Sequence, residues 1–132
     1  MKKNFYALSI ACVFRITCTC SLGPKKSPSG VVLEALKAAN EGRYAEAEKY
    51  LSFNLMDAIK EAHESFPSFA PDLKAFLNEW TRNRTIERTT ILDEEIRGDI
   101  AKVRYRIQFK DGITKEYEKN LIKEGGQWKI TA

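Results

Sequence analysis

The sequence predicts an α+β fold, with helices in the first part of one domain and an antiparallel sheet in the second. Between residues 29 and 80, apolar residues recur at helical spacing. From residue 101, apolar and polar or charged residues alternate one by one, as in a strand with one buried and one solvated face. Glycine-containing turns separate the segments after residue 97. Helices that precede an antiparallel sheet in this way are expected to pack on one of its faces.

The helical part contains several start and stop signals. A first helix is expected to begin near Ser29 and to end before Gly42, which suits the position after a helix C-terminus. Further helices are expected over residues 43–51 and 54–64. Pro71 suits the first turn of another helix, because proline is tolerated there.

The sheet part is expected to form three or four antiparallel strands. The first covers residues 85–97, where broken alternation indicates a bulge. The second, residues 101–109, shows the clearest alternation in the chain and leads into a hairpin turn at residues 110–112. The inward-facing residues expected in the last two strands are Ile113, Tyr117, Leu121, Trp128 and Ile130.

Composition and charge fit one globular domain and argue against nucleic-acid binding. The chain has 132 residues, 43% hydrophobic and 30% charged. Its net charge of +4 is concentrated at the start, since three of the 22 basic residues and none of the 18 acidic residues lie in residues 1–24. The rest is close to neutral. It therefore lacks the basic excess of a phosphate-binding domain, and we expect no nucleic-acid partner.

The first 20 residues are predicted to be an export signal. Lys2 and Lys3 precede an apolar run over residues 5–14. Ten residues are too few for a bilayer span, which needs about 20, but they match the apolar region of a signal peptide. We therefore expect a signal segment at residues 1–20, a flexible tether at 21–28 and the folded domain at 29–132, located in the cell envelope.

The cysteines reinforce this division. Cys12, Cys18 and Cys20 all lie within the predicted signal, so the domain has no disulfide, cysteine-based zinc site or thiol nucleophile. The end of the signal resembles that of bacterial lipoproteins, in which a cysteine is lipidated, and Cys20 is the candidate. Secretion without lipid and retention without processing are the alternatives. Membrane contact is expected only through such an anchor.

Three stretches resemble a known family. They are residues 31–36 with 41–47, residues 98–103 leading to 109–112, and residues 121–130. Together they resemble the small bacterial lipoproteins of the DUF4878 type, within the NTF2-like superfamily. The resemblance implies a cone, in which a curved antiparallel sheet wraps against helices and often encloses a cavity. It also implies a cell-envelope setting and no settled activity.

No catalytic, cofactor or metal site is predicted. Related cone-fold enzymes use an acid, a histidine or a tyrosine in the cavity, but the single histidine, His63, lies on a polar helical stretch. An isomerase or hydrolase of this type would instead need a buried acid with a shifted pKa. The candidates for that acid are Asp57, Asp93, Glu94, Glu95 and Asp99.

Two further sets of residues each have two interpretations. The first set could line a cavity or fill the core: Trp80, Tyr105, Tyr117 and Trp128. The second set could bind an anion or form an ordinary outward sheet face: Lys102, Arg104, Arg106 and Lys110. The ordinary interpretation of the basic row requires cross-strand partners, for which Glu116, Glu118 and Glu124 are placed.

The leading functional hypothesis is a non-enzymatic envelope domain that binds a small apolar ligand or a protein partner. A cone-fold enzyme with a buried carboxylate is one alternative. An inhibitor or immunity protein for an envelope hydrolase is another, because such functions depend on surface loops. Homodimerisation through the open face of the sheet is a further option.

Overall fold

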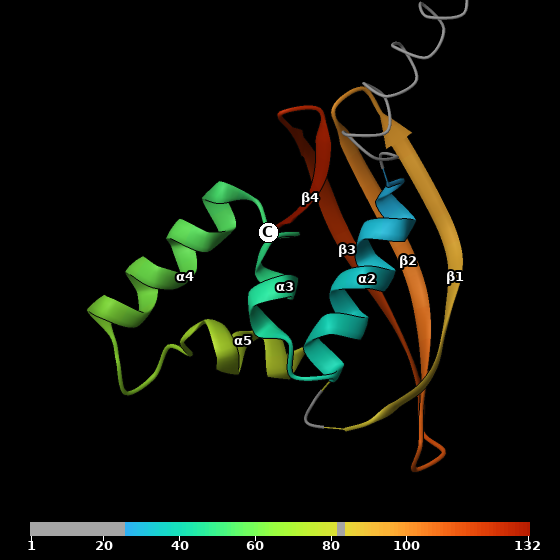
Figure 1. The fold of residues 1–132 in the computed structure, drawn as a ribbon, viewed down its shortest axis with the longest axis horizontal. Coiled ribbons are helices and arrows are strands. Elements are labelled where there is room, and N and C mark those ends of the chain that lie inside the picture. Colours follow the sequence, from blue (N-terminus) through green and yellow to red (C-terminus); the bar gives the residue numbers. More distant parts are fainter. Residues whose placement is uncertain (1–25, 82–83) are drawn as a thin grey trace, which may run out of the picture.

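The computed structural model describes residues 26–81 and 84–132. In this part of the chain, helices come first and strands follow (Figure 1). The predictions for residues 1–25, namely the export signal, lipidation of Cys20 and most of the tether, lie outside the described residues. The elements are α2 (Pro28–Asn40), α3 (Tyr44–Glu48), α4 (Phe53–Ser65), α5 (Leu73–Glu79), β1 (Ile86–Arg97), β2 (Ile100–Phe109), β3 (Thr114–Glu124) and β4 (Gln127–Thr131).

Helix α2 begins one residue earlier than the expected Ser29. The Ser27 side chain accepts a hydrogen bond from the Gly30 amide at 3.1 Å, which makes Ser27 the N-cap and places Pro28 in the first turn. The helix ends before Gly42, whose φ of 79° is left-handed and suits glycine. One face of α2 is buried against β1, β2 and β4.

The remaining helices are positioned by polar contacts. Ser52 and Asp72 cap α4 and α5 with their side chains, so Pro71 precedes the cap instead of occupying the first turn as expected. The Tyr44 hydroxyl donates to the Asn78 side chain at 2.7 Å, which ties α3 to α5. Among the described helices, none is both long enough and apolar enough to cross a membrane.

The four strands form one antiparallel sheet in the order β1-β2-β3-β4, which confirms the predicted α+β architecture. Strand β1 is irregular in two places, between Ile86 and Arg88 and between Ile91 and Asp93, consistent with the expected bulge. Figure 1 shows the curvature of the long strands.

The core lies between α2 and the middle of the sheet. The five helix-facing residues of β2 are all buried, and four of them are at most 1% exposed. Ile113, expected to face inward, precedes β3 in the turn and is 38% exposed, so that expectation is wrong. The buried residues of β2 are Ala101, Val103, Tyr105, Ile107 and Phe109.

The outer edge of β4 is joined to the chain before α4. The Ser52 amide donates to the Ile130 carbonyl at 2.8 Å, and the Ile130 amide donates to the Tyr50 carbonyl at 2.7 Å. Helix α4 therefore starts at the sheet and then extends away from it (Figure 1). This departure separates the far part of α4 from the strands.

Candidate functional site

A pocket of about 280 Å³ lies where α4, α5 and the sheet meet. Leu55 of α4, Phe76 of α5, Trp80 just after α5 and Ile130 of β4 supply its apolar walls. Lys119 of β3 also lines it. The pocket therefore combines an apolar surface with a basic group, as small-molecule sites commonly do.

The position of this pocket follows from the unequal lengths of β3 and β4. Strand β4 ends at Thr131, which pairs with Asn120. Toward its N-terminal end β3 continues past this point without β4 beside it, starting with Lys119. The pocket lies at this step in the sheet, since Asn120, Thr131 and Lys119 all line it.

Lys119 faces the helices even though it is a lysine. It pairs directly with Val103, which is fully buried, and residues paired in an antiparallel sheet point to the same face. Its Nζ lies 4.4 Å from the centroid of the Trp80 ring. A cation over an indole face is attracted by the ring electrons, which favours this placement.

Burial of Lys119 changes its proton affinity. Loss of solvent lowers its pKa from 10.5 to about 8, because the charged form is the one that burial disfavours. In the part of the chain that is described, no carboxylate lies within ion-pair distance of its Nζ. Lys119 is thus a partly desolvated cation, whose charge is stabilised among the described residues by the Trp80 ring.

Two tyrosines lie next to this site on the same face. Tyr105 of β2 pairs with Tyr117 of β3, and their ring centroids are 5.7 Å apart. Burial, and secondarily the Tyr117 phenol, raises the pKa of Tyr105 far above its usual value near 10. The Tyr117 hydroxyl is buried and finds no hydrogen-bond partner among the described residues.

The four aromatic residues considered as pocket lining occupy different positions. Trp80 lines the pocket and contacts the Phe76 ring edge-on, with centroids 6.0 Å apart. Tyr105 is 1% exposed and belongs to the core. Trp128 is also buried, and the Nζ of Lys123 lies 5.2 Å from its ring centroid. Neither Tyr105, Tyr117 nor Trp128 is among the residues that line this pocket.

Lys119 was not singled out by the sequence analysis, although the sequence contained a signal. Tyr117 and Leu121 were both expected to face inward, and the residue between them by strand parity is Lys119. A lysine at a core-facing position is uncommon, because a buried charge is unfavourable without compensation.

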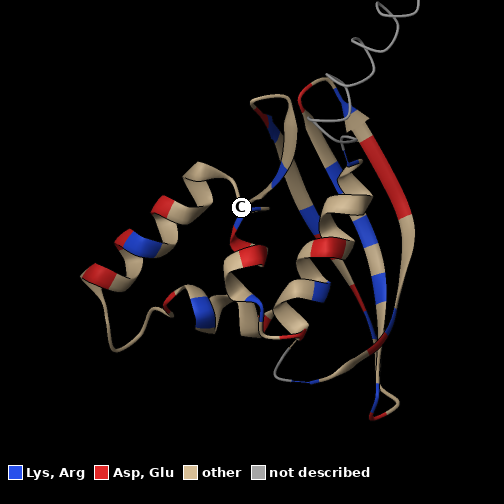
Figure 2. Cartoon of the chain, viewed as in Figure 1, with Lys and Arg blue, Asp and Glu red and all other residues tan. Residues whose placement is uncertain are grey.

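Two of the four residues in the basic row have the partners that an ordinary outward face requires. Arg104 and Lys110, the latter in the turn after β2, form no ion pair among the described residues. Arg106 forms an ion pair with Glu116 at 3.0 Å, and Lys102 approaches Glu118 at 3.8 Å. Figure 2 shows the acidic stretch of β1 beside the basic residues of β2. Glu124 has a different role, since its carboxylate accepts from the Phe53 amide at the start of α4.

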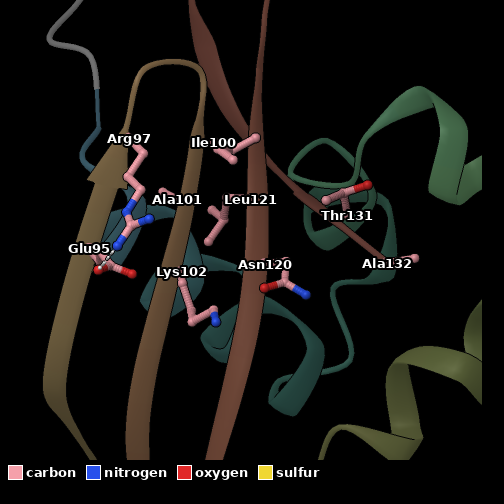
Figure 3. A pocket seen from close by; sticks show the side chains of 9 residues that line it. All are labelled: Glu95, Arg97, Ile100, Ala101, Lys102, Asn120, Leu121, Thr131 and Ala132. Carbon is pink, nitrogen blue, oxygen red and sulfur yellow. Dashed lines mark hydrogen bonds and ion pairs between the residues drawn. The ribbon is translucent and has the colours of Figure 1, made fainter.

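A second concavity, of about 470 Å³, lies on the outer face of the sheet (Figure 3). Lys102 and Asn120 project into it, and Arg97 and Glu95 form an ion pair at 3.1 Å beside it. Lys102 and Arg97 both have carboxylate partners, whereas Lys119 in the other pocket has none among the described residues.

The five acids on which the enzyme hypothesis depends are all exposed: Asp57, Asp93, Glu94, Glu95 and Asp99. None of them lines the pocket at Lys119. Glu94 instead accepts hydrogen bonds from the Ser29 amide and hydroxyl, at 2.9 and 2.6 Å. In residues 26–81 and 84–132, no group of three or more histidine, cysteine or acidic side chains is arranged to hold a metal ion.

His63 lies in a groove of about 460 Å³ between α4 and α5, away from Lys119. Its Nδ1 is 2.9 Å from the Ala70 carbonyl oxygen, so the ring helps to hold the connection between the two helices. Phe66 and Phe69, in that connection, are 62% and 88% exposed. The histidine is therefore partly buried and structurally engaged, not fully solvated.

Comparison with known proteins identifies the family and the fold. The model of the family described as a domain of unknown function, DUF4878, matches residues 20–131. No curated protein matches the sequence.

Two solved structures resemble this one. A protein described as a candidate NTF2-like transpeptidase from Campylobacter jejuni has a TM-score of 0.61 at 17% identity, covering 81% of this chain and 99% of its own. A SEC-C motif containing protein from Rhodopseudomonas palustris has a TM-score of 0.60 at 13% identity, covering 80% and 76%. At these identities the likeness concerns the fold. With the family match and the curved sheet packed against helices, it follows that this chain belongs to the DUF4878 family and has an NTF2-like α+β fold.

Proposed function

We propose that the domain binds a small, mainly apolar molecule in the pocket at Lys119, without transforming it. The observation that carries the proposal is the pocket itself. It has a volume of about 280 Å³, and Leu55, Phe76, Trp80 and Ile130 wall it. This is close to the lower end of the usual range for small-molecule sites, about 300 Å³, so a ligand of modest size is expected.

Binding is favoured over catalysis by the placement of the reactive side chains. The five acids singled out from the sequence are exposed and outside this pocket, and His63 lies in the groove between α4 and α5. Glu118 does line the pocket, but it is exposed and forms an ion pair with Lys102. Residues 21–132 contain no cysteine. The transpeptidase activity named for the Campylobacter jejuni protein is therefore not part of this proposal.

Native mass spectrometry of the full chain, purified without detergent from the cells that express it, tests the proposal. We expect a retained small molecule in the wild type. We expect it to be lost in Trp80→Leu and kept in the matched control Trp128→Leu, because both tryptophans are buried but only Trp80 lines the pocket. A wild-type protein that carries no ligand and binds no apolar probe would overturn the proposal.

The cell envelope is the proposed setting, supported by the basic and apolar pattern of residues 1–20. If Cys20 is lipidated, the mature chain begins at Cys20 and its mass includes the acyl groups. Cys20→Ser should abolish that mass increase, whereas Cys18→Ser should leave it. An intact chain in the cytoplasmic fraction would contradict the envelope assignment.

A protein partner is the second candidate, favoured by the exposed Phe66 and Phe69 in the α4–α5 connection. Crosslinking in cells through a photoreactive residue at position 69 would capture such a partner, and the same residue at position 45, exposed on α3, is the control. Equal crosslinking from both positions would count against this surface.

A further inference from the structure

Lys119 is the charged side chain whose position the proposed binding role does not yet explain. It lies on the helix-facing side of β3, with its Nζ 4.4 Å from the Trp80 ring centroid. An apolar residue there would fit the surrounding walls without loss of solvation. The location of a lysine at this point therefore suggests a ligand with a complementary group.

Lys119 is partly buried and has no carboxylate partner among the described residues, which distinguishes it from Arg106 and Lys102 of the outer face. Arg106 and Lys102 each have a glutamate on β3 within ion-pair distance. For Lys119, no described carboxylate lies that close. A partly buried cation without a counter-charge is unfavourable, and an incoming anion would remove that imbalance.

A second polar group on the same strand is also unsatisfied. Tyr117 precedes Lys119 by two residues and therefore faces the same side of β3. Its hydroxyl is buried and has no hydrogen-bond partner in the described part of the chain. Buried polar groups normally have such a partner. Tyr117 does not line the pocket, so its hydroxyl shows that this face of β3 is less completely satisfied than that of β2, and the charge of Lys119 alone carries the inference.

The rest of the pocket is apolar where it faces the helices. Leu55, Phe76 and Ile130 contribute no charge. Glu118, which also lines the pocket, forms an ion pair with Lys102 at 3.8 Å. The cationic group therefore lies at one end of an apolar surface. That arrangement suits a molecule with an apolar body and one charged end.

We infer that the ligand is a small amphiphile with a single anionic headgroup, which pairs with Lys119 while its apolar part lies against Trp80, Phe76 and Leu55. This inference rests on the proposed binding function and specifies its ligand class. A carboxylate and a phosphate share the required chemistry, because the lysine ammonium acts as a point charge toward either.

Isothermal titration calorimetry of the full chain with four matched eight-carbon probes tests the inference. The probes are octanoate, octyl phosphate, octan-1-ol and octylammonium. At pH 7 we expect an anionic probe to bind at least about tenfold more tightly than octan-1-ol, and octylammonium to bind most weakly, since a charge-assisted contact is stronger than a neutral one. The tighter of the two anions identifies the headgroup.

Two lysine variants provide the matched comparison. Lys119→Met should reduce the affinity for the preferred anion by about tenfold or more and leave that for octan-1-ol within about twofold. Lys123→Met is the control, because Lys123 is on the same strand and also lies over a tryptophan ring, but is exposed and outside the pocket. It should change neither affinity.

The pH profile gives an independent readout. Because burial lowers the pKa of Lys119 to about 8, affinity for octanoate should fall as pH rises from 7 to 9 in the wild type and stay flat in Lys119→Met. The helices and β4 contribute no titratable side chains to this pocket. The titratable side chains nearby are Glu118 and Tyr117 on β3 and Tyr105 on β2.

The outcomes separate the two proposals. If octan-1-ol and the anions bind equally, and Lys119→Met changes none of the affinities, the inference of an anionic headgroup is wrong. The proposed binding function would still stand. Tighter binding of octylammonium would also overturn the inference. If no probe binds, the binding function fails as well.

Discussion

Strands β2 and β3 run side by side in one register, but their helix-facing residues are buried to different degrees. On β2 the five residues from Ala101 to Phe109 that face the helices are all buried. On β3 only Leu121 is, whereas Tyr117 and Lys119 are partly exposed and Lys123 is exposed. The difference follows from what covers each strand. Helix α2 packs on β2, while β3 extends beyond the end of β4.

The comparison separates the stabilising part of the domain from its candidate binding part. The β2 face is a dry core in which every inward side chain is apolar or aromatic. The β3 face tolerates a lysine and an unpaired hydroxyl, which are unfavourable for stability. Groups that reduce stability often serve binding, because a ligand can satisfy what the protein leaves open.

Alanine substitution of the paired tyrosines should give the largest difference in stability between the two strands. Tyr105→Ala is expected to lower the free energy of unfolding by about 3–5 kcal/mol, as for other buried aromatic residues, and Tyr117→Ala by about half as much. Urea denaturation followed by circular dichroism measures both. Equal losses would show that the two faces are equally well packed.

Lys119→Met should stabilise the protein at neutral pH. A lysine whose pKa is lower in the folded state than in the unfolded state destabilises the fold below the folded pKa, and this effect disappears as pH rises from about 8 to about 10.5. After allowance for partial exposure and for the Trp80 contact, the gain at pH 7 is expected to be about 1–3 kcal/mol.

Thermal or urea unfolding from pH 7 to 9.5 measures this gain as a difference between variant and wild type. The raised pKa of Tyr105 lowers the stability of the fold only above about pH 10. Tyr105 therefore does not affect the difference between variant and wild type within this pH range. Lys123→Met is the control, and its difference from wild type should not depend on pH. A gain for Lys119→Met that is the same at both ends of the range would contradict the buried-lysine explanation.

Tyr117→Phe is expected to stabilise the protein by about 0.5–1.5 kcal/mol, because it removes a buried hydroxyl that has no partner among the described residues. Tyr44→Phe is the matched control. Its hydroxyl donates to Asn78, so the same change should destabilise by about 1 kcal/mol. Destabilisation of similar size by both changes would show that the Tyr117 hydroxyl is satisfied in solution.

The ion pairs on the outer face of the sheet should contribute least to the stability of the fold. The Arg106–Glu116 pair is about half exposed on both sides, and its coupling energy in a double-mutant cycle is expected to be at most about 0.5 kcal/mol. The coupling should decrease at high salt. A coupling above about 1.5 kcal/mol would indicate that this face is covered, for example by a second copy of the chain.

The fold was largely predictable because its signals are local. The alternation over residues 101–109 specifies a strand with one buried face, and the glycine turns specify its antiparallel neighbours. The start of α2 and the position of Pro71 differed by one or two residues from expectation, because the caps depend on which side chain meets which amide. The prediction that Ile113 faces inward was wrong for a similar reason, because the turn includes Ile113 and β3 begins after it.

The candidate site was predictable only in part. Trp80 was singled out as an aromatic residue that could line a cavity or fill the core, but composition and spacing could not distinguish it from Trp128, which is equally buried. Lys119 could have been found from strand parity. Its lack of a counter-charge could not, since that depends on the contacts of residues distant in sequence.

By itself, then, the sequence determined the α+β class, the order of helices and strands, and which face of β2 is buried, because hydrophobic periodicity and turn residues act over short stretches of chain. Tertiary structure decided where β4 stops against β3, that Trp80 covers Lys119, and that the acids of β1 stay exposed. Trp80 and Lys119, for example, are 39 positions apart in the sequence, and local pattern carries no information about contacts between such distant residues.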